Sequence, residues 1–375
     1  MYKLIRAVTV PQSLGFIESL LLQLKKKYEV QLLSSPGENL ERICQEYDVT
    51  GHRIEMFRRM SPVKDIKSLY QLIKVFHKEK PFMVHSMTPK AGLLCMLAAW
   101  ITRVPRRVHT FTGLIWPTTS GFSRRILMLT DWLTCACATH IIPEGQGVLN
   151  DLQLHITKKP MKVLGYGNVK GVDMTYFSRR PEIQSKVKNL RRKGTFTFIF
   201  VGRLVKDKGI NELVEAFTQL YNKYINVRLL LVGKYETEFD PLKEETLDRI
   251  KALPAIKAVG AQYGDDLLAH YMASDCFVFP SYREGFPNTV LEAGAMGLPS
   301  IVTDINGSRE IIIHGENGLI VPSKNSDALY GAMKQMLLDT TAREKMAANA
   351  RPLIDSRFEK SFVQGCLIKF YEEIL

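Results

Sequence analysis

The sequence has no apolar segment long enough to span a bilayer: the longest run covers only residues 91–101, and residues 126–142 are interrupted by an aspartate and a histidine. Its six cysteines are scattered. The one close pair, Cys135 and Cys137, is weak evidence for a metal, so buried free thiols are expected. The N-terminal residues read as a first strand and not as a secretory signal. These features predict a cytoplasmic protein without a bound metal.

Two common nucleotide-binding patterns are also missing. No Gly-x-Gly-x-x-Gly follows a strand-like run, which argues against a nicotinamide or flavin site, and no Gly-x-x-x-x-Gly-Lys-Ser/Thr phosphate loop occurs. Basic and aromatic residues do not alternate as they do in nucleic-acid-binding modules. Nucleic acid is therefore not an expected partner.

Charge is distributed unevenly along the 375 residues, which carry a formal net charge of +13. Residues 1–170 hold 24 Lys and Arg against 12 Asp and Glu, whereas residues 171–375 hold 27 against 26. A field of one sign on the first half suggests an anionic partner, such as a membrane surface or a phosphorylated substrate. A basic surface that serves only solubility is the alternative.

Short apolar runs alternate with longer helical patterns along the chain. In the first half, strands are predicted over residues 4–10, 28–34, 82–85 and 107–111, and helices over 15–27 and 63–78. In the second half, strands are predicted over 195–201, 227–232, 276–279 and 300–302, and helices over 209–224, 241–253, 289–296 and from 326 onward. Continuous apolar strands between helices indicate parallel sheets covered on both faces. We therefore predict an α/β fold with two Rossmann-like, doubly wound domains that face a central cleft and meet near residue 170.

The first of two charged motifs covers residues 201–209. An apolar strand runs into Gly202 and a loop that carries Arg203 and Lys208, and a helix opens around Gly209. Two cations and a helix N-terminus at the end of a strand suit phosphate oxygens. Charge on a surface loop is an equally acceptable interpretation of this motif alone.

The second motif, residues 280–293, follows a strand that ends at Phe279. A turn with Gly and Pro exposes backbone amides before a helix that begins near Asn288. Glu284 lies on the turn, and Glu292 lies about one turn inside the helix. Two carboxylates so placed can accept hydrogen bonds from sugar and ribose hydroxyls, while the helix N-terminus favours a diphosphate. Two solvated glutamates around a helix cap are the alternative.

Together the two motifs resemble those of the family 4 glycosyltransferases, in which two glutamates are separated by seven residues. Residues 294–303, 307–311 and 317–322 match the same family in order and spacing, so the resemblance covers about residues 195–325. It implies the GT-B fold, a nucleoside-diphosphate sugar as donor, retention of anomeric configuration, and neither a cofactor nor a required metal. The absence of Asp-x-Asp agrees with the last point.

The resemblance also implies a separate role for each domain. Residues 171–355 would bind the donor, residues 1–170 would face acceptor and membrane, and a helix over residues 356–375 would pack back on the first domain. The implied donor-binding residues are Gly15, Gly202, Arg203, Lys208, Gly260, Gly285, Phe286, Pro287, Asn288, Thr289 and Glu292. The implied catalytic residues are Arg203 and Lys208 at the departing diphosphate, Glu284 at the donor sugar, and His109.

The first half resembles the family less closely. Many members have a glycine pair after the first strand, where this chain has only Gly15, and many carry a histidine at the position of Thr112, three residues after His109. His109 is therefore either a site residue or a strand histidine whose ring is hydrogen-bonded within the protein. His85 and Lys90, near a helix start, are acceptor-side candidates with the same two interpretations. The departing phosphate oxygen can accept the acceptor's proton instead of a histidine.

Residues 85–99, 104–113 and 167–173 resemble bacterial enzymes of capsule, O-antigen and exopolysaccharide assembly. That resemblance implies a polyprenyl-diphosphate-linked saccharide as acceptor, a peripheral position on the inner face of the cell membrane, and a UDP-linked hexose or N-acetylhexosamine as donor. We expect Trp116, Arg124 and Arg125 to contact membrane or acceptor, with core packing of Trp116 as the alternative. A non-catalytic sugar-nucleotide-binding subunit and a nucleotide-sugar epimerase remain as alternative functions.

Overall fold

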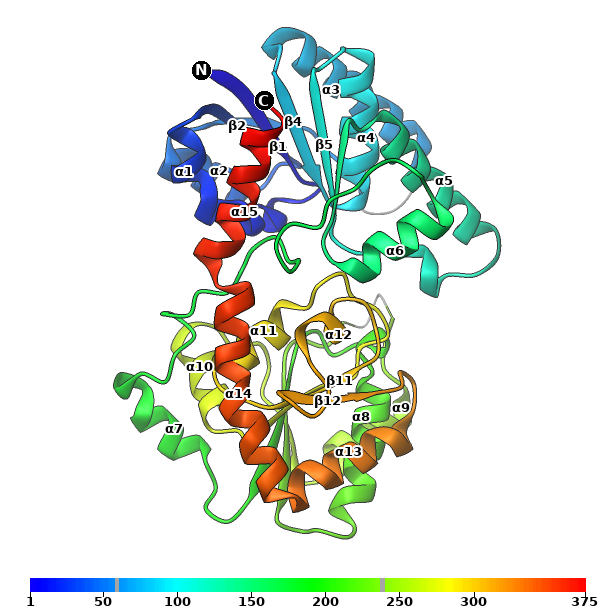
Figure 1. Ribbon diagram of the computed structural model, residues 1–375. Helices are drawn as coiled ribbons and strands as arrows, with labels where there is room; N and C mark the ends of the chain where they lie inside the picture. The colour runs from blue at the N-terminus through cyan, green and yellow to red at the C-terminus, as the bar shows by residue number, and fades with distance from the viewer. Residues whose placement is uncertain (58–60, 237–239) are drawn as a thin grey trace. The chain divides into compact units, whose positions relative to one another are not determined.

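A computed structural model describes residues 1–57, 61–236 and 240–375 of the chain. It divides into two compact units: unit 1 comprises residues 1–170 and 361–375, and unit 2 comprises residues 171–360 (Figure 1). In the described part of each unit, six parallel strands form one sheet with helices on both faces. The predicted α/β class with two Rossmann-like domains is thereby confirmed.

Unit 1 orders its strands β3-β2-β1-β4-β5-β6. The strands are β1 (Tyr2–Ala7), β2 (Tyr28–Ser34), β3 (Thr50–Arg53), β4 (Met83–Met87), β5 (Arg106–Phe111) and β6 (His140–Pro143). Successive side chains of a strand point to opposite faces, and so Leu4 and Ile5 of β1 enter two different core clusters. The sheet therefore needs helices on both sides.

The helices of unit 1 supply those two layers (Figure 1). One layer contains α1 (Leu21–Lys25), α2 (Glu38–Tyr47) and α15 (Lys360–Glu373), and the other contains α3 (Pro62–Glu79), α4 (Pro89–Ile101), α5 (Gly121–Cys137) and α6 (Gln146–His155). The helix predicted over residues 15–27 is wrong in its first half, because residues 11–20 form two 3-10 turns before α1.

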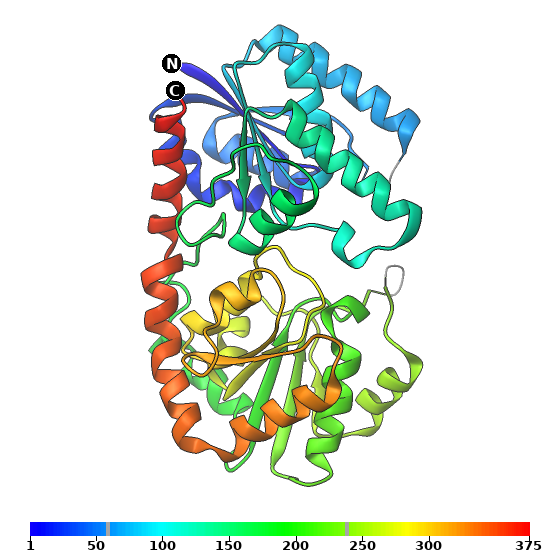
Figure 2. The same cartoon turned by 45° about the vertical axis from the view of Figure 1, so that its right-hand side comes forward.

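Unit 2 orders its strands β12-β11-β10-β7-β8-β9. They are β7 (Phe196–Val201), β8 (Val227–Val232), β9 (Ile256–Ala258), β10 (Cys276–Phe279), β11 (Ser300–Thr303) and β12 (Gly318–Val321). The helices are α7 (Gln184–Leu190), α8 (Ile210–Tyr221), α9 (Glu244–Ala252), α10 (Gly264–Met272), α11 (Asn288–Ala295), α12 (Ser308–Ile311), α13 (Ser326–Leu338) and α14 (Thr340–Phe358). Helix α8 packs against α9 and α13, while α11 packs against α14 and α10 against α7, so the sheet is covered on both faces (Figure 2).

Candidate active site

Strands β7 and β10 bring the two charged motifs of unit 2 together. They are parallel neighbours, so the segments that follow them leave the same edge of the sheet. Gly209 marks their contact: its φ is 70°, and a Cβ atom there would lie 2.0 Å from the carbonyl oxygen of Pro280. Only glycine fits this close approach.

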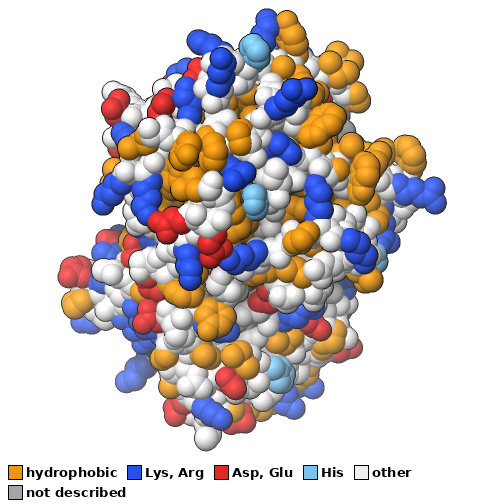
Figure 3. All heavy atoms as spheres, turned by 45° about the horizontal axis from the view of Figure 1, so that its top comes forward, with side chains coloured by type: hydrophobic (Ala, Val, Ile, Leu, Met, Phe, Trp, Pro, Cys, Tyr) orange, Lys and Arg blue, Asp and Glu red, His pale blue; other side chains and the backbone are white. Residues whose placement is uncertain are grey.

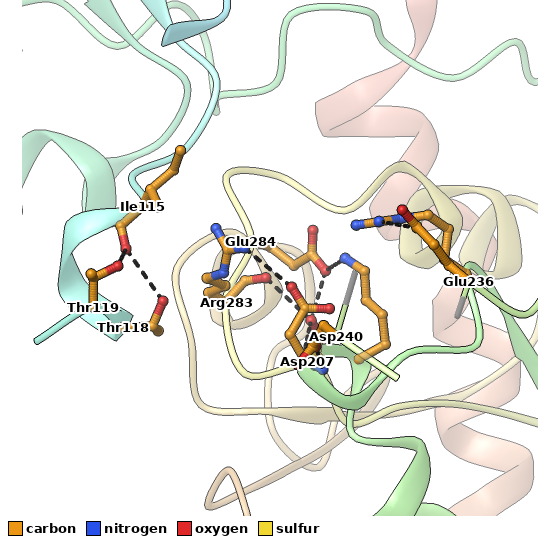
Figure 4. A network of polar contacts seen from close by, with 11 residues as sticks. Ile115, Thr118, Thr119, Asp207, Glu236, Asp240, Arg283 and Glu284 are labelled. Carbon is orange, nitrogen blue, oxygen red and sulfur yellow. Dashed lines mark hydrogen bonds and ion pairs between the residues drawn. The ribbon is translucent and has the colours of Figure 1, made fainter. Parts of the chain in front are cut away.

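Lys208 and Glu284 form an ion pair at this edge, with each side chain only 15% exposed. The hydroxyl of Ser281 donates to the same carboxylate oxygen at 2.7 Å, and Ser281 is itself buried. Figure 4 places Glu284 beside Arg283 and Asp207, which form a neighbouring ion pair at 3.2 Å. The carboxylate is therefore held by a charged partner and a hydroxyl donor from two loops.

A second ion pair joins Arg203 to Glu236 at 2.6 Å, with the side chains 54% and 30% exposed. Glu236 follows β8, the other neighbour of β7, and was not among the residues singled out from the sequence. Farther along the same segment, the carboxylate of Asp240 accepts the backbone N–H of Asp207 at 2.5 Å (Figure 4). The signal for Glu236 was its position just after a buried strand that ends at the same sheet edge.

Glu292 lies in the second turn of α11. The hydroxyl of Tyr271, a buried residue of α10, donates to its carboxylate at 3.2 Å. Burial, reinforced by the nearby charge of Glu292, raises the pKa of the Tyr271 phenol well above its usual value, so the phenol stays a donor. Tyr271 therefore positions this carboxylate, a role that the sequence pattern does not reveal.

The remaining predicted donor residues of unit 2 lie along the same edge. Gly202 directly follows β7, and the carbonyl of Gly260 accepts the N–H of Gly233, which directly follows β8 (2.9 Å). Gly285 and Pro287 are buried in the loop before α11, whose first two residues are Asn288 and Thr289. Phe286 points into the core and lies 5.3 Å from Phe358, centroid to centroid, so only its backbone remains for a ligand. The roles of these residues stay predictions.

The two histidines of unit 1 that the sequence singled out, His85 and His109, lie in its interior. His109 packs against Gly92 and Phe111 and shares a 2.9 Å hydrogen bond with the hydroxyl of Ser86, and burial lowers its pKa to about 3. It is 1% exposed, which fits the alternative of a strand histidine hydrogen-bonded within the protein and not a base in contact with substrate. His85 is equally buried and is hydrogen-bonded to Thr110 at 2.7 Å.

Three other predicted residues of unit 1 are explained by local packing. Trp116 is 2% exposed and lies 5.3 Å from the ring of His155, so its membrane contact is wrong and the alternative of core packing is confirmed. Lys90 pairs with Asp65 at 2.5 Å in a largely buried position. Gly15 lies in a 3-10 turn where a Cβ atom would meet nothing, so this loop does not require a glycine there.

Several side chains of α5 lie at the surface. The guanidinium of Arg124 lies 5.6 Å from the centre of the Trp116 ring, and Arg125 is exposed. Phe122, Leu129 and Trp132 are also exposed and recur with Arg125 at helical spacing, so they form one stripe along the helix. Within the described residues, every helix is too short or too polar to cross a membrane.

The edge of unit 2 can thus bind an anionic, hydroxyl-rich ligand. Among its charged groups, the cations Arg203 and Lys208, the carboxylates of Glu284 and Glu292, and the N-terminal amides of α11 together match a diphosphate flanked by sugar and ribose. Both cations are paired with carboxylates, and a diphosphate would have to exchange with them.

Comparison with known proteins supports the same chemistry. Residues 182–352 match the family described as glycosyl transferases group 1, and residues 12–137 match the family described as glycosyl transferase 4-like. The capsular polysaccharide biosynthesis glycosyltransferase CapM of Staphylococcus aureus is 33% identical over 377 residues, covering 100% of this chain and 97% of that protein.

Two further proteins extend the comparison. The UDP-Gal:alpha-D-GlcNAc-diphosphoundecaprenol alpha-1,3-galactosyltransferase of Escherichia coli is 28% identical over 352 residues and 88% of each chain. The crystal structure of Anabaena Alr3699/HepE in complex with UDP has a TM-score of 0.80 at 19% identity, covering 99% of this chain and 100% of that chain. The structural likeness confirms the predicted GT-B fold.

Proposed function

This chain belongs to the family 4 glycosyltransferases of the GT-B fold, and on that premise we propose that it is a retaining enzyme that transfers a sugar from a UDP-sugar to a lipid-linked saccharide in bacterial surface polysaccharide assembly. The observation that carries the proposal is the convergence of Lys208, Arg203, Glu284 and Glu292 on one sheet edge.

Lys208 and Arg203 act on the leaving group. As the bond between the anomeric carbon and the diphosphate oxygen breaks, negative charge grows on the phosphate oxygens. Two fixed cations and the amides at the start of α11 stabilise that charge, which is the contribution a divalent metal would otherwise make. The reaction therefore needs no metal in this proposal.

Glu284 and Glu292 hold the two ends of the donor. Once the diphosphate forms an ion pair with Lys208, the carboxylate of Glu284 can accept hydrogen bonds from hydroxyls of the donor sugar. The hydroxyl of Ser281 keeps this carboxylate in place. Glu292, oriented by Tyr271, accepts from the ribose hydroxyls. The departing phosphate oxygen takes the proton of the acceptor hydroxyl on the same face of the sugar, a step that retains configuration and requires no histidine.

The names of similar proteins support the choice of substrates. The E. coli relative is named for a UDP-galactose donor and a diphosphoundecaprenol-linked acceptor, and the Anabaena structure contains UDP. We therefore propose for this chain a UDP-linked hexose or N-acetylhexosamine as donor and a polyprenyl-diphosphate-linked saccharide as acceptor.

The surface of unit 1 supports a peripheral position on the inner face of the cell membrane. Residues 1–170 carry twice as many Lys and Arg as Asp and Glu, and Figure 3 shows basic and apolar side chains intermixed on the face turned to the viewer. The stripe of Phe122, Arg125, Leu129 and Trp132 on α5 combines aromatic side chains with a cation, as interfacial helices do. Anionic headgroups would attract this unit.

Transfer with labelled UDP-sugars tests the proposal. The chain is incubated with UDP-glucose, UDP-galactose, UDP-N-acetylglucosamine or UDP-N-acetylgalactosamine and a polyprenyl-diphosphate disaccharide, with and without EDTA. We expect one donor to yield an α-linked lipid product that EDTA does not suppress. UDP binding without any transfer would indicate a non-catalytic subunit, and conversion of the free UDP-sugar without acceptor would indicate an epimerase.

A further inference from the structure

A basic hollow lies in unit 2 around the segment that joins α7 to β7. Its volume is about 690 Å³, within the range of small-molecule sites. Its charged lining consists of Lys188, Arg191, Arg192, Lys193, Arg343 and a single carboxylate, that of Asp275. Five cations therefore surround the space with one acidic neighbour.

Both oxygens of the Asp275 carboxylate already accept hydrogen bonds from the protein. One oxygen of Asp275 accepts from Arg191 at 3.1 Å, and the other accepts the backbone N–H of Thr197 at 2.8 Å. In the described part of the chain, Lys188, Arg192 and Lys193 have no carboxylate within ion-pair distance. The second half of the sequence is nearly neutral, so this concentration of charge is local and does not follow from a generally basic half.

A buried cation adds to the same field. Arg228 of β8 is 6% exposed and donates to the carbonyl of Leu190 at 2.9 Å, while its Nε has no partner among the described residues. Burial first, and then the charge of Arg192, lower the pKa of Arg228. Asp275 counters only part of that lowering and forms no ion pair with Arg228 among the described residues. A buried guanidinium without an ion pair is costly, and an anion in the adjoining hollow would offset that cost.

The hollow is separate from the donor edge. Its residues 191–195 precede β7, Phe196 begins that strand, and Asp275 precedes β10, whereas the donor motifs follow the other ends of the same strands. Arg343 is already oriented, because it donates to the carbonyls of Met336 and Leu337 at 2.8 and 3.1 Å and stacks over Phe196. A ligand here would not compete with the nucleotide.

We propose that this hollow is a second ligand site, which binds a phosphate-bearing anion with two or more phosphate charges. Guanidinium groups bind phosphate oxygens in bidentate fashion, and the convergence of several cations favours a multiply charged group over a single carboxylate. The same chemistry is offered by a soluble oligophosphate and by a phospholipid headgroup.

Calorimetric titration of the full chain with tripolyphosphate, in saturating UDP, tests the first source. We expect binding that weakens by roughly tenfold or more in the double variant Arg192→Gln/Lys193→Gln, since each lost charged contact contributes on that scale. Both residues are exposed, so the variant should fold. Lys186→Gln is the matched control, because Lys186 lies on α7 but pairs with Asp266 outside the hollow.

Sedimentation with cardiolipin vesicles, whose headgroup carries two phosphates, tests the second source with the wild-type chain, the double variant and the Lys186→Gln control. Loss of tripolyphosphate binding in the double variant alone assigns the hollow to a soluble phosphate, and loss of vesicle binding alone assigns it to a headgroup. If the double variant and the control behave alike in both assays, the proposal is overturned. This comparison does not depend on whether the chain binds UDP.

Discussion

The ammonium of Lys208 and the carboxylate of Glu284 neutralise each other at the carboxyl edge of the unit 2 sheet. In the proposed mechanism, a donor diphosphate has to draw Lys208 away from Glu284, and the released carboxylate then becomes available to the donor sugar. The proposal therefore assigns opposite effects to Glu284, which would compete with the phosphate before binding and assist the reaction after it.

The substitution Glu284→Gln should separate these two effects. The amide keeps the shape and can still accept from Ser281, but it no longer competes for Lys208, so UDP should bind about fivefold more tightly. Transfer should fall by about 100-fold, because a charged contact to the reacting sugar is lost. Calorimetry and an initial-rate assay measure the two, with the exposed Glu215→Gln of α8 as control. Weaker UDP binding in Glu284→Gln would contradict the competition.

Glu292 should recognise ribose specifically. Wild-type protein should prefer UDP over 2′,3′-dideoxyuridine diphosphate by about tenfold or more, the size of a hydrogen bond to a charged group. Glu292→Ala should bind both nucleotides equally, and Tyr271→Phe should lose part of the preference because the carboxylate is no longer oriented. An undiminished preference in Glu292→Ala would show that the ribose lies elsewhere.

The exposed stripe of α5 should bind membrane. Phe122→Ala/Trp132→Ala should partition at least about 100-fold less onto phosphatidylglycerol vesicles, since each buried aromatic side chain contributes on the order of 1.5–3 kcal/mol. Raising the salt concentration should weaken the wild-type protein's binding. The control Ile225→Ala/Tyr263→Ala removes apolar side chains of unit 2 that are at least as exposed. Equal partitioning of the two double variants would refute this surface.

Asp131 should make stability depend on pH. Burial raises its pKa to about 7, whereas an unfolded aspartate titrates near 4. The folded state therefore favours the protonated form, and its stability falls as pH rises through that window and is constant above it. Urea unfolding should show Asp131→Asn gaining about 2 kcal/mol over wild type between pH 5 and pH 8. A constant difference between the two proteins would mean that Asp131 titrates normally.

Much of the fold could be predicted from apolar strands between amphipathic helices. The strands over residues 28–34, 227–232 and 276–279 have the predicted bounds because each is rich in apolar or β-branched residues and lies at the sheet interior. Strand β3 was missed, since Thr50–Arg53 is a short edge strand with glycine, histidine and arginine and little burial. Strand β12 was missed because it begins with glycine.

The site was predictable only where local sequence encodes it. The motifs of residues 201–209 and 280–293 identified both cations and both glutamates, but Glu236 and Tyr271 reach them from other segments by tertiary packing. Ser281 lies within the second motif, and the pattern alone did not reveal its hydrogen bond to Glu284. The burial of His109 and Trp116 likewise depends on helices distant in sequence, such as α4 and α6, and no local pattern distinguishes a buried histidine from an exposed one.

The affinity for UDP of the wild-type chain and of Lys208→Ala tests the central claim most directly. Titration calorimetry should give one UDP per chain for wild type, no measurable binding for Lys208→Ala, and unchanged binding for Lys334→Ala, which removes an exposed lysine of α13. UDP binding that is equal in all three proteins, or absent from folded wild-type protein, would contradict a donor site at this edge.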